Sequence, residues 1–228
     1  ARESDDVLYT WAGPEIAVAT TKGYSTQLSV MYLLAVYFGK AKQEISLQEQ
    51  NQYITDLKKV PEDVKSLLEL EERIKVLAKQ YAQSKDVFVI GRGIDHAAAM
   101  EASLKLKEIS YIHSEAYAAG ELKHGTISLI EDGTLVVAIA TQQTLFEKLV
   151  SNIKEVKARG ANVVAITPRG NEAIEKVADE VFYIPEGNEL FSASSTVVPM
   201  QLLAYYIAVE RGCDVDKPRN LAKSVTVE

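Results

Sequence analysis

The sequence predicts an α/β protein with a doubly wound parallel sheet flanked by helices and an extra helical part at the N-terminus. Four short runs rich in β-branched residues predict the strands, near 86–90, 134–140, 162–167 and 181–184. Helical stretches separate these runs, such as the one at 144–160. Continuous apolar strands that alternate with helices are typical of a parallel sheet covered on both faces. Right-handed crossovers between such strands make the sheet doubly wound.

A further helical signal lies near the N-terminus, in residues 13–40. A loop there runs into a helix near 20–39 whose apolar residues continue almost all round, and such a helix is expected to be buried. Residues 194–216 have a similar pattern, since both stretches run from Gln-Leu through small, aliphatic and tyrosine residues to a glycine. We interpret this weak internal repeat as the last helix of each of two domains. We therefore expect that most of the first domain lies outside this sequence.

Two helical stretches connect the repeats. Ser46 is a suitable N-cap for the first, and Pro61, followed by acidic residues, suits the first position of the second. Apolar residues at helical spacing mark the second stretch: Leu67, Leu70, Ile74 and Leu77. The charged residues of this connector are more typical of a solvated helix face than of a binding patch.

Composition and charge exclude several classes of protein. The chain has 228 residues, enough for a sizeable core, and 47% of them are apolar, an ordinary globular value. A net charge of −7 argues against nucleic acid as a partner. The one cysteine, Cys213, excludes an internal disulfide framework and fits a reducing compartment. The sequence has no run of about eighteen apolar residues and no secretion signal at its start, so we expect a cytoplasmic protein without a membrane span.

Two loops are expected at the carboxyl edge of the sheet, where such folds bind ligands. The loop "GRGIDH" at 91–96 is not a dinucleotide fingerprint, because His96 stands where a third glycine is needed. Gly91 and Gly93 are better explained by a tight turn from strand to helix. The loop "TQQT" at 141–144 has no glycine, so we expect a poor phosphate site there.

Residues 104–126 concentrate titratable side chains, with three lysines, three glutamates and two histidines. On a helix expected over 97–108, Glu101, Lys105 and Glu108 share one stripe. Taken alone, this spacing is more typical of a ladder of surface ion pairs.

The residues that follow favour a site. Two glycines and several small residues surround Glu121, Lys123 and His124, and small residues allow a ligand or a second subunit to approach the backbone closely. A histidine can also carry a proton near neutral pH.

Three separated motifs resemble one family. They are "AGPEIAVATTK" at 12–22, "LKLKEISYIHSEAYAAGELKHG" at 104–125 and "DVDKPRNLAKSVTVE" at 214–228. In this order they are similar to the glucosamine-6-phosphate synthases, also called glutamine–fructose-6-phosphate aminotransferases, which carry two sugar-isomerase (SIS) domains in tandem. The resemblance implies four parts: the end of a first SIS domain (1–40), a helical connector (41–84), a second SIS domain (85–212) and an active-site tail (213–228).

The resemblance also implies a reaction and its catalytic residues. Fructose 6-phosphate reacts with ammonia derived from glutamine to give glucosamine 6-phosphate, without a cofactor or a metal ion. Glu108 falls on the carboxylate that carries a proton between C1 and C2, and Lys223 on the lysine that forms a Schiff base with the sugar. His124 falls on the group that assists ring opening and acts across a homodimer interface. Lys105 falls on a further active-site lysine.

Substrate contacts follow from the same match. Thr20, together with the Val18 backbone, falls on sugar-contacting positions, where the family often has serine in place of Thr20. The Ala222 backbone falls on another such position.

Two departures from the family limit what this chain is expected to do. Ala1 stands where the family's glutaminase domain begins with a nucleophilic cysteine, and the phosphate-binding loop of the first SIS domain is not in the sequence. We therefore expect the 228-residue chain to be inactive by itself. Two other readings stay open: a SIS module that binds a sugar phosphate without catalysis, and a dimerisation module. The joint presence of Glu108 and Lys223 favours the enzyme.

Overall fold

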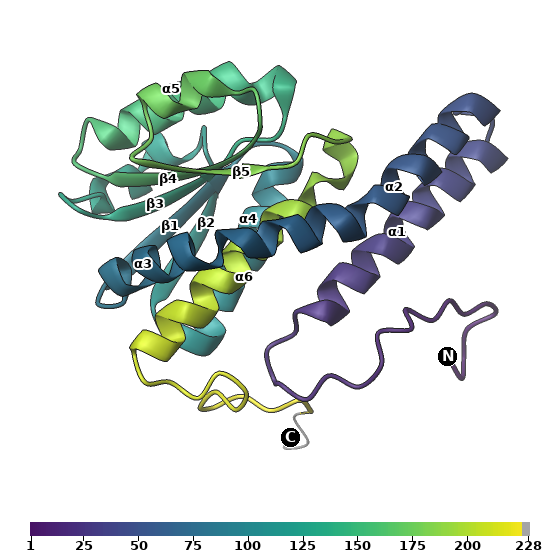
Figure 1. The fold of residues 1–228 in the computed structure, drawn as a ribbon, viewed down its shortest axis with the longest axis horizontal. Helices are drawn as coiled ribbons and strands as arrows, with labels where there is room; N and C mark the ends of the chain where they lie inside the picture. Colours follow the sequence, from purple (N-terminus) through teal and green to yellow (C-terminus); the bar gives the residue numbers. More distant parts are fainter. Residues whose placement is uncertain (225–228) are drawn as a thin grey trace.

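A parallel sheet forms the centre of the protein, which the computed structural model describes over residues 1–224 (Figure 1). In these residues the sheet has five strands in the order β2-β1-β3-β4-β5, and every neighbouring pair is parallel. The strands are β1 (Asp86–Gly91), β2 (His113–Ala118), β3 (Leu135–Ile139), β4 (Asn162–Pro168) and β5 (Glu180–Ile184). The predicted fold class is confirmed, and so are the four strands that the apolar runs indicated.

The sequence analysis missed β2, which lies inside the charged segment. This strand pairs with β1 at the edge of the sheet, where His113 lies opposite Asp86 and Ala118 opposite Gly91. Ser114 is its one fully buried residue. A half-exposed edge strand needs no continuous apolar run, so a search for such runs could not find it.

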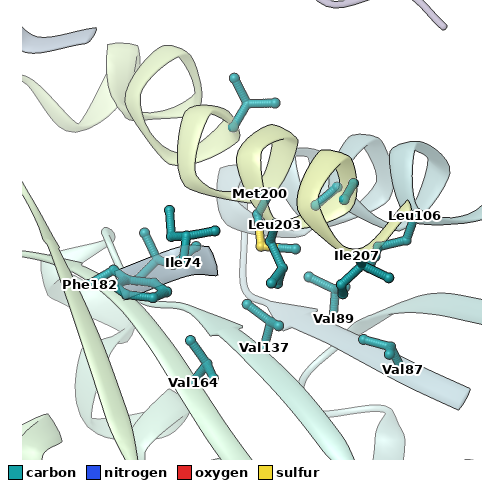
Figure 2. Close-up of a cluster of buried hydrophobic side chains, with 14 of the residues drawn as sticks. Ile74, Val87, Val89, Leu106, Val137, Val164, Phe182, Met200, Leu203 and Ile207 are labelled. Carbon is teal, nitrogen blue, oxygen red and sulfur yellow. The ribbon is translucent and has the colours of Figure 1, made fainter. Parts of the chain in front are cut away.

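Helices cover both faces of the sheet. The flanking helices are α3 (Glu71–Tyr81), α4 (Ile94–Ser110), α5 (Phe146–Lys157) and α6 (Ser192–Glu210). Val87 and Val89 of β1 pack under α3, α4 and α6, as Figure 2 shows for this side of the core. Phe88 and Ile90 point to the opposite side, where α5 packs. Burial of both faces explains why the inner strands β1, β3 and β4 are largely apolar, and each fully buried apolar side chain contributes about 1.5–3 kcal/mol.

The two helices of the internal repeat have different surroundings. The segment Glu189–Glu210, which contains α6, is long and apolar enough to cross a membrane, but 67% of its apolar window is buried inside the protein. It packs against α3 and α4, as the core helix of a sheet protein does. The other helix, α1 (Lys22–Ala41), buries only Val36 and leaves four large apolar residues exposed: Met31, Leu33, Tyr37 and Phe38.

The connector consists of α2 (Leu47–Leu67) and α3, joined by a short 3-10 helix at Leu68–Leu70. Ser46 is the N-cap of α2 as predicted, and the structure shows that it also forms a capping box with Glu49. The predicted helix start at Pro61 is wrong, since Pro61 lies inside α2 and the break comes seven residues later, at Leu68. The other 3-10 helices are Leu122–His124, Thr126–Leu129, Gln143–Leu145, Glu172–Lys176 and Glu189–Phe191.

Candidate active site

A buried lysine lies at the centre of the candidate site. Lys105 is only 3% exposed on α4, and its Nζ forms ion pairs with Glu108 Oε2 at 2.5 Å and Glu101 Oε1 at 3.4 Å. The interpretation of this stripe as a surface ladder is therefore wrong. Burial raises the pKa of Glu101, against the opposing attraction of the Lys105 ammonium. A buried ammonium between two carboxylates fixes the position of all three groups.

The loop that precedes α1 lies over this cluster. Lys105 Nζ donates a hydrogen bond to the backbone oxygen of Thr20 at 3.0 Å. The predicted substrate-binding residue Thr20 therefore lies beside the predicted catalytic residues of α4, although 85 positions separate Thr20 from Lys105 in the sequence.

Glu15 shapes this loop, and the sequence analysis did not identify it. Its Oε1 accepts a hydrogen bond from Thr21 N at 2.8 Å, just before α1 begins. Gly23 leaves the space, because a Cβ there would lie 3.2 Å from Glu15 Oε2. Burial alone would raise the pKa of Glu15, but the Thr21 hydrogen bond and the Lys223 ammonium lower it to about 2. The sequence signal was a carboxylate six positions before Thr21, the N-cap of α1, where it accepts from an N–H that has no partner inside the helix.

The tail brings Lys223 to the same loop. Its Nζ donates to the backbone oxygens of Ala17 at 2.7 Å and Val18 at 3.3 Å, and lies 3.3 Å from Glu15 Oε2. Val18 N in turn donates to Asp216 O at 2.9 Å, so loop and tail are bonded in both directions. Ala222 precedes Lys223 and is exposed. The predicted site residues Val18, Ala222 and Lys223 therefore lie on one side of the protein, and Lys223 remains 44% exposed.

A cavity of about 210 Å³ lies between the loop, α4 and α6. Its lining includes Ala17, Lys105, Gln201 and Asp216. The Nε2 of Gln201 is buried and has no hydrogen-bond partner among the described residues. The lining is mostly apolar, and a few charged and amide groups face the space next to the loop, a composition that is common in ligand sites.

His124 is not part of this cluster within one chain. It is exposed in the 3-10 helix that follows β2, beyond the carboxyl end of that strand. Glu108 lies near the C-terminus of α4, only a few residues before β2 starts. A strand of six residues spans about 20 Å, so β2 separates His124 from Glu108. Among residues 1–224, no hydrogen bond or ion pair joins the two side chains.

At the carboxyl edge of the sheet, two carboxylates accept hydrogen bonds from backbone amides of the loop after β3. Asp95 is buried in the first turn of α4, where its oxygens accept from Thr141 N at 2.8 Å and Thr141 Oγ1 at 2.5 Å. Gln143 N donates to Glu189 Oε1 at 2.9 Å. Burial raises the pKa of Asp95 to about 6. Backbone amides that could hold a phosphate are thus occupied, which supports the expectation that the loop at 141–144 is a poor phosphate site.

The glycines of the first loop behave as the turn requires. A Cβ on Gly91 would lie 2.5 Å from the backbone of Asp95, and Gly93 has a φ of +56°. Both features allow β1 to turn tightly into α4. Among residues 1–224, no group of three His, Cys, Asp or Glu side chains is arranged to hold a metal ion.

Replacing Glu15 by Gln should remove a pH-dependent part of the stability. The carboxylate has a lower pKa in the folded chain, about 2, than its ordinary value of 4.5, so it stabilises the fold above pH 4.5 and this stabilisation is lost as the pH falls toward 2. By thermal unfolding, the parent should melt at a higher temperature than Glu15→Gln at about pH 6, and this gap should narrow by about pH 3. Glu44→Gln, at an exposed glutamate with no side-chain contact in the described residues, is the control. An equal gap at both pH values would contradict the assignment.

Comparison with known proteins gives three findings. Residues 80–211 match the model of the SIS domain family. Over 228 residues the chain is 61% identical to the glutamine–fructose-6-phosphate aminotransferase (isomerizing) of Caldanaerobacter subterraneus subsp. tengcongensis and 55% identical to that of Clostridium tetani, and it spans 38% of the length of each. The structure is similar to the C-terminal domain of glucosamine-fructose-6-phosphate aminotransferase from Francisella tularensis, with a TM-score of 0.90 and 34% identity over 95% of this chain and 61% of that one.

Proposed function

The chain belongs to the SIS domain family, and from this premise we propose that it is the isomerase part of a glutamine–fructose-6-phosphate aminotransferase. The resemblance seen in the sequence motifs is confirmed by the identity over the whole chain. One observation carries the proposal. The loop at residues 12–21 connects a carboxylate on α4 with an amine on the tail. The tail amine, Lys223, bonds to the loop directly, and the carboxylate, Glu108, is ion-paired with Lys105, which bonds to the loop.

In the proposed reaction, fructose 6-phosphate opens, the Lys223 amine forms an imine at C2 with loss of water, and ammonia then displaces the lysine amine to give the imine of the sugar. A proton then moves from C1 to C2, which gives glucosamine 6-phosphate. Glu108 suits the role of the base that removes and returns this proton. Its Oε2 lies 2.5 Å from Lys105 Nζ, and the side chain is still 22% exposed, so the carboxylate is open to a substrate. Lys223 carries a primary amine, the group that can form a Schiff base with the sugar carbonyl.

The remaining contacts of the substrate are proposed on the same basis. The backbones of Val18 and Ala222 and the hydroxyl of Thr20 bind the sugar, and the reaction needs no cofactor. We propose the four-part division given above, in which residues 1–40 belong to a first SIS domain. The exposed apolar side chains of α1 support this division, because a domain helix of such composition is expected to be covered.

We also propose a cytoplasmic homodimer. The separation of His124 from Glu108 within one chain supports a site shared between two copies, in which His124 of one copy assists ring opening in the other. The single cysteine fits a reducing compartment.

The proposal is tested with the full-length natural protein that contains this chain. It should form glucosamine 6-phosphate from fructose 6-phosphate and glutamine. The 228-residue chain alone, with fructose 6-phosphate and ammonia, should form little or none. It lacks the phosphate-binding loop expected in the first SIS domain, so the binding energy of the sugar phosphate and the exact placement of the sugar against the catalytic groups are both lost. Binding of fructose 6-phosphate by the full-length protein without any product would favour the non-catalytic SIS module instead.

A further inference from the structure

Helix α4 ends in an unusual residue, three positions after Glu108. Tyr111 is the C-cap of α4 and has φ 59° and ψ 18°, in the left-handed region that residues other than glycine seldom adopt. This turn stops the helix and leaves the tyrosine side chain half-buried at its end. A tyrosine in a glycine-like conformation suggests that the side chain itself has a task.

The C-terminal tail is attached to this tyrosine by two separate contacts. The backbone N–H of Arg219 donates a hydrogen bond to Tyr111 Oη at 2.8 Å. The guanidinium carbon of the same arginine lies 4.2 Å from the centroid of the Tyr111 ring, a cation–π contact. The first contact uses the tyrosine hydroxyl and the second its ring, so different substitutions separate them.

The tail is also fixed just upstream of Arg219. Asp214 Oδ1 accepts from the backbone N–H groups of Asp216 and Lys217 at 3.0 and 2.9 Å, and Pro218 is buried. Between Arg219 and Lys223, no group forms a hydrogen bond with the described residues. The contact with Tyr111 is therefore the last fixed point of the described tail before Lys223.

We propose that Tyr111 and Arg219 form a latch, a pair of positioning residues that sets where the Lys223 amine lies relative to Glu108. The latch joins the tail to α4, the helix that carries Glu108. The position of the Lys223 amine is therefore fixed relative to the same helix as the base. Neither latch residue touches the reacting atoms. The inference rests on the proposed function, because it assumes that the Lys223 amine reacts with the sugar.

Matched variants of the full-length enzyme test the latch. Tyr111→Phe removes the hydrogen bond and keeps the cation–π contact. Arg219→Ala removes the cation–π contact and keeps the backbone N–H that donates the hydrogen bond. Tyr111→Ala removes both contacts. We expect kcat to fall by roughly tenfold in the first two and by on the order of a hundredfold in the third, since a displacement of about 1 Å can cost that much. Arg219→Lys keeps a cation above the ring and should retain more activity than Arg219→Ala.

Two further readouts separate positioning from a loss of folded protein. The rate of borohydride trapping of the sugar should fall in parallel with kcat, and the Arg219 amide should exchange its hydrogen faster in Tyr111→Phe than in the parent. Tyr183→Phe is the control. Tyr183 lies on β5, at the opposite edge of the sheet, and this change removes the hydrogen bond that its hydroxyl donates to Glu175. It should match the parent in kcat and trapping.

The outcomes distinguish the latch from the proposed function. If the parent enzyme is active and Tyr111→Phe has the parental kcat and trapping rate, the latch is overturned and the function stands. Equal losses in Tyr111→Phe and Tyr183→Phe overturn it too, since they indicate a general structural effect. If the parent forms no glucosamine 6-phosphate, the proposed function fails. In that case unchanged exchange of the Arg219 amide overturns the latch, and faster exchange supports it as a tail anchor.

Discussion

Replacing Glu108 by Gln in the full-length enzyme should remove most of the proton transfer, by about 100- to 10,000-fold. An amide is no base, whereas its size and shape match those of the carboxylate, so the site should keep its form. Lys105 would lose its ion pair with the Glu108 carboxylate but keep its ion pair with Glu101 and its hydrogen bond to the Thr20 oxygen. The measurement is exchange of deuterium from solvent into the migrating position, made beside a binding assay with fructose 6-phosphate.

A matched glutamate provides the control for this experiment. Glu147 is exposed in the first turn of α5, on the other face of the sheet from α4. Glu147→Gln is the same chemical change and should leave the exchange rate as in the parent. Exchange at the parental rate in Glu108→Gln would move the role of base to another group.

Replacing Lys223 by Arg should abolish borohydride trapping of the sugar. The guanidinium keeps the positive charge and can donate to the oxygens of Ala17 and Val18, but it does not form an imine. The tail should therefore stay in place while the chemistry stops. Trapping is measured by mass spectrometry of the reduced full-length protein, which also shows the modified residue.

Lys217→Arg is the control for the tail. Lys217 is exposed, and its side chain forms no hydrogen bond or ion pair with the described residues, so this variant should be trapped like the parent. If Lys223→Arg were still trapped, the modified peptide would show which lysine forms the Schiff base. Modification of Lys105 would assign the amine to α4 instead of the tail.

Local patterns in the sequence were sufficient for most of the fold. The strands at 86–91, 135–139 and 162–168 are buried almost throughout and are largely apolar, and the edge strand at 180–184 is partly buried but still carries Val181, Phe182 and Ile184. The N-cap Ser46 could also be predicted from local sequence, because helix capping depends on residues that are only a few positions apart. The motifs also identified the family. Pro61 was misjudged, because surrounding structure can hold a helix together where local propensity is poor.

The candidate site was decided by contacts between distant parts of the chain. Spacing put Glu101, Lys105 and Glu108 on one stripe, but contacts with distant parts of the chain bury it, among them the bond from Lys105 to Thr20, which spans 85 positions. The bonds from Lys223 to Ala17 and from Arg219 to Tyr111 span 206 and 108 positions.

The sequence by itself determined most of the helices and strands and proposed which residues carry chemistry, because these inferences depend on side-chain type and short-range patterns. Only the tertiary structure decided that the Glu15 carboxylate holds the loop and that His124 lies away from Glu108 in one chain. It also decided that the tail is attached at Tyr111. Burial and ion pairing depend on which surfaces meet, and no local pattern records that.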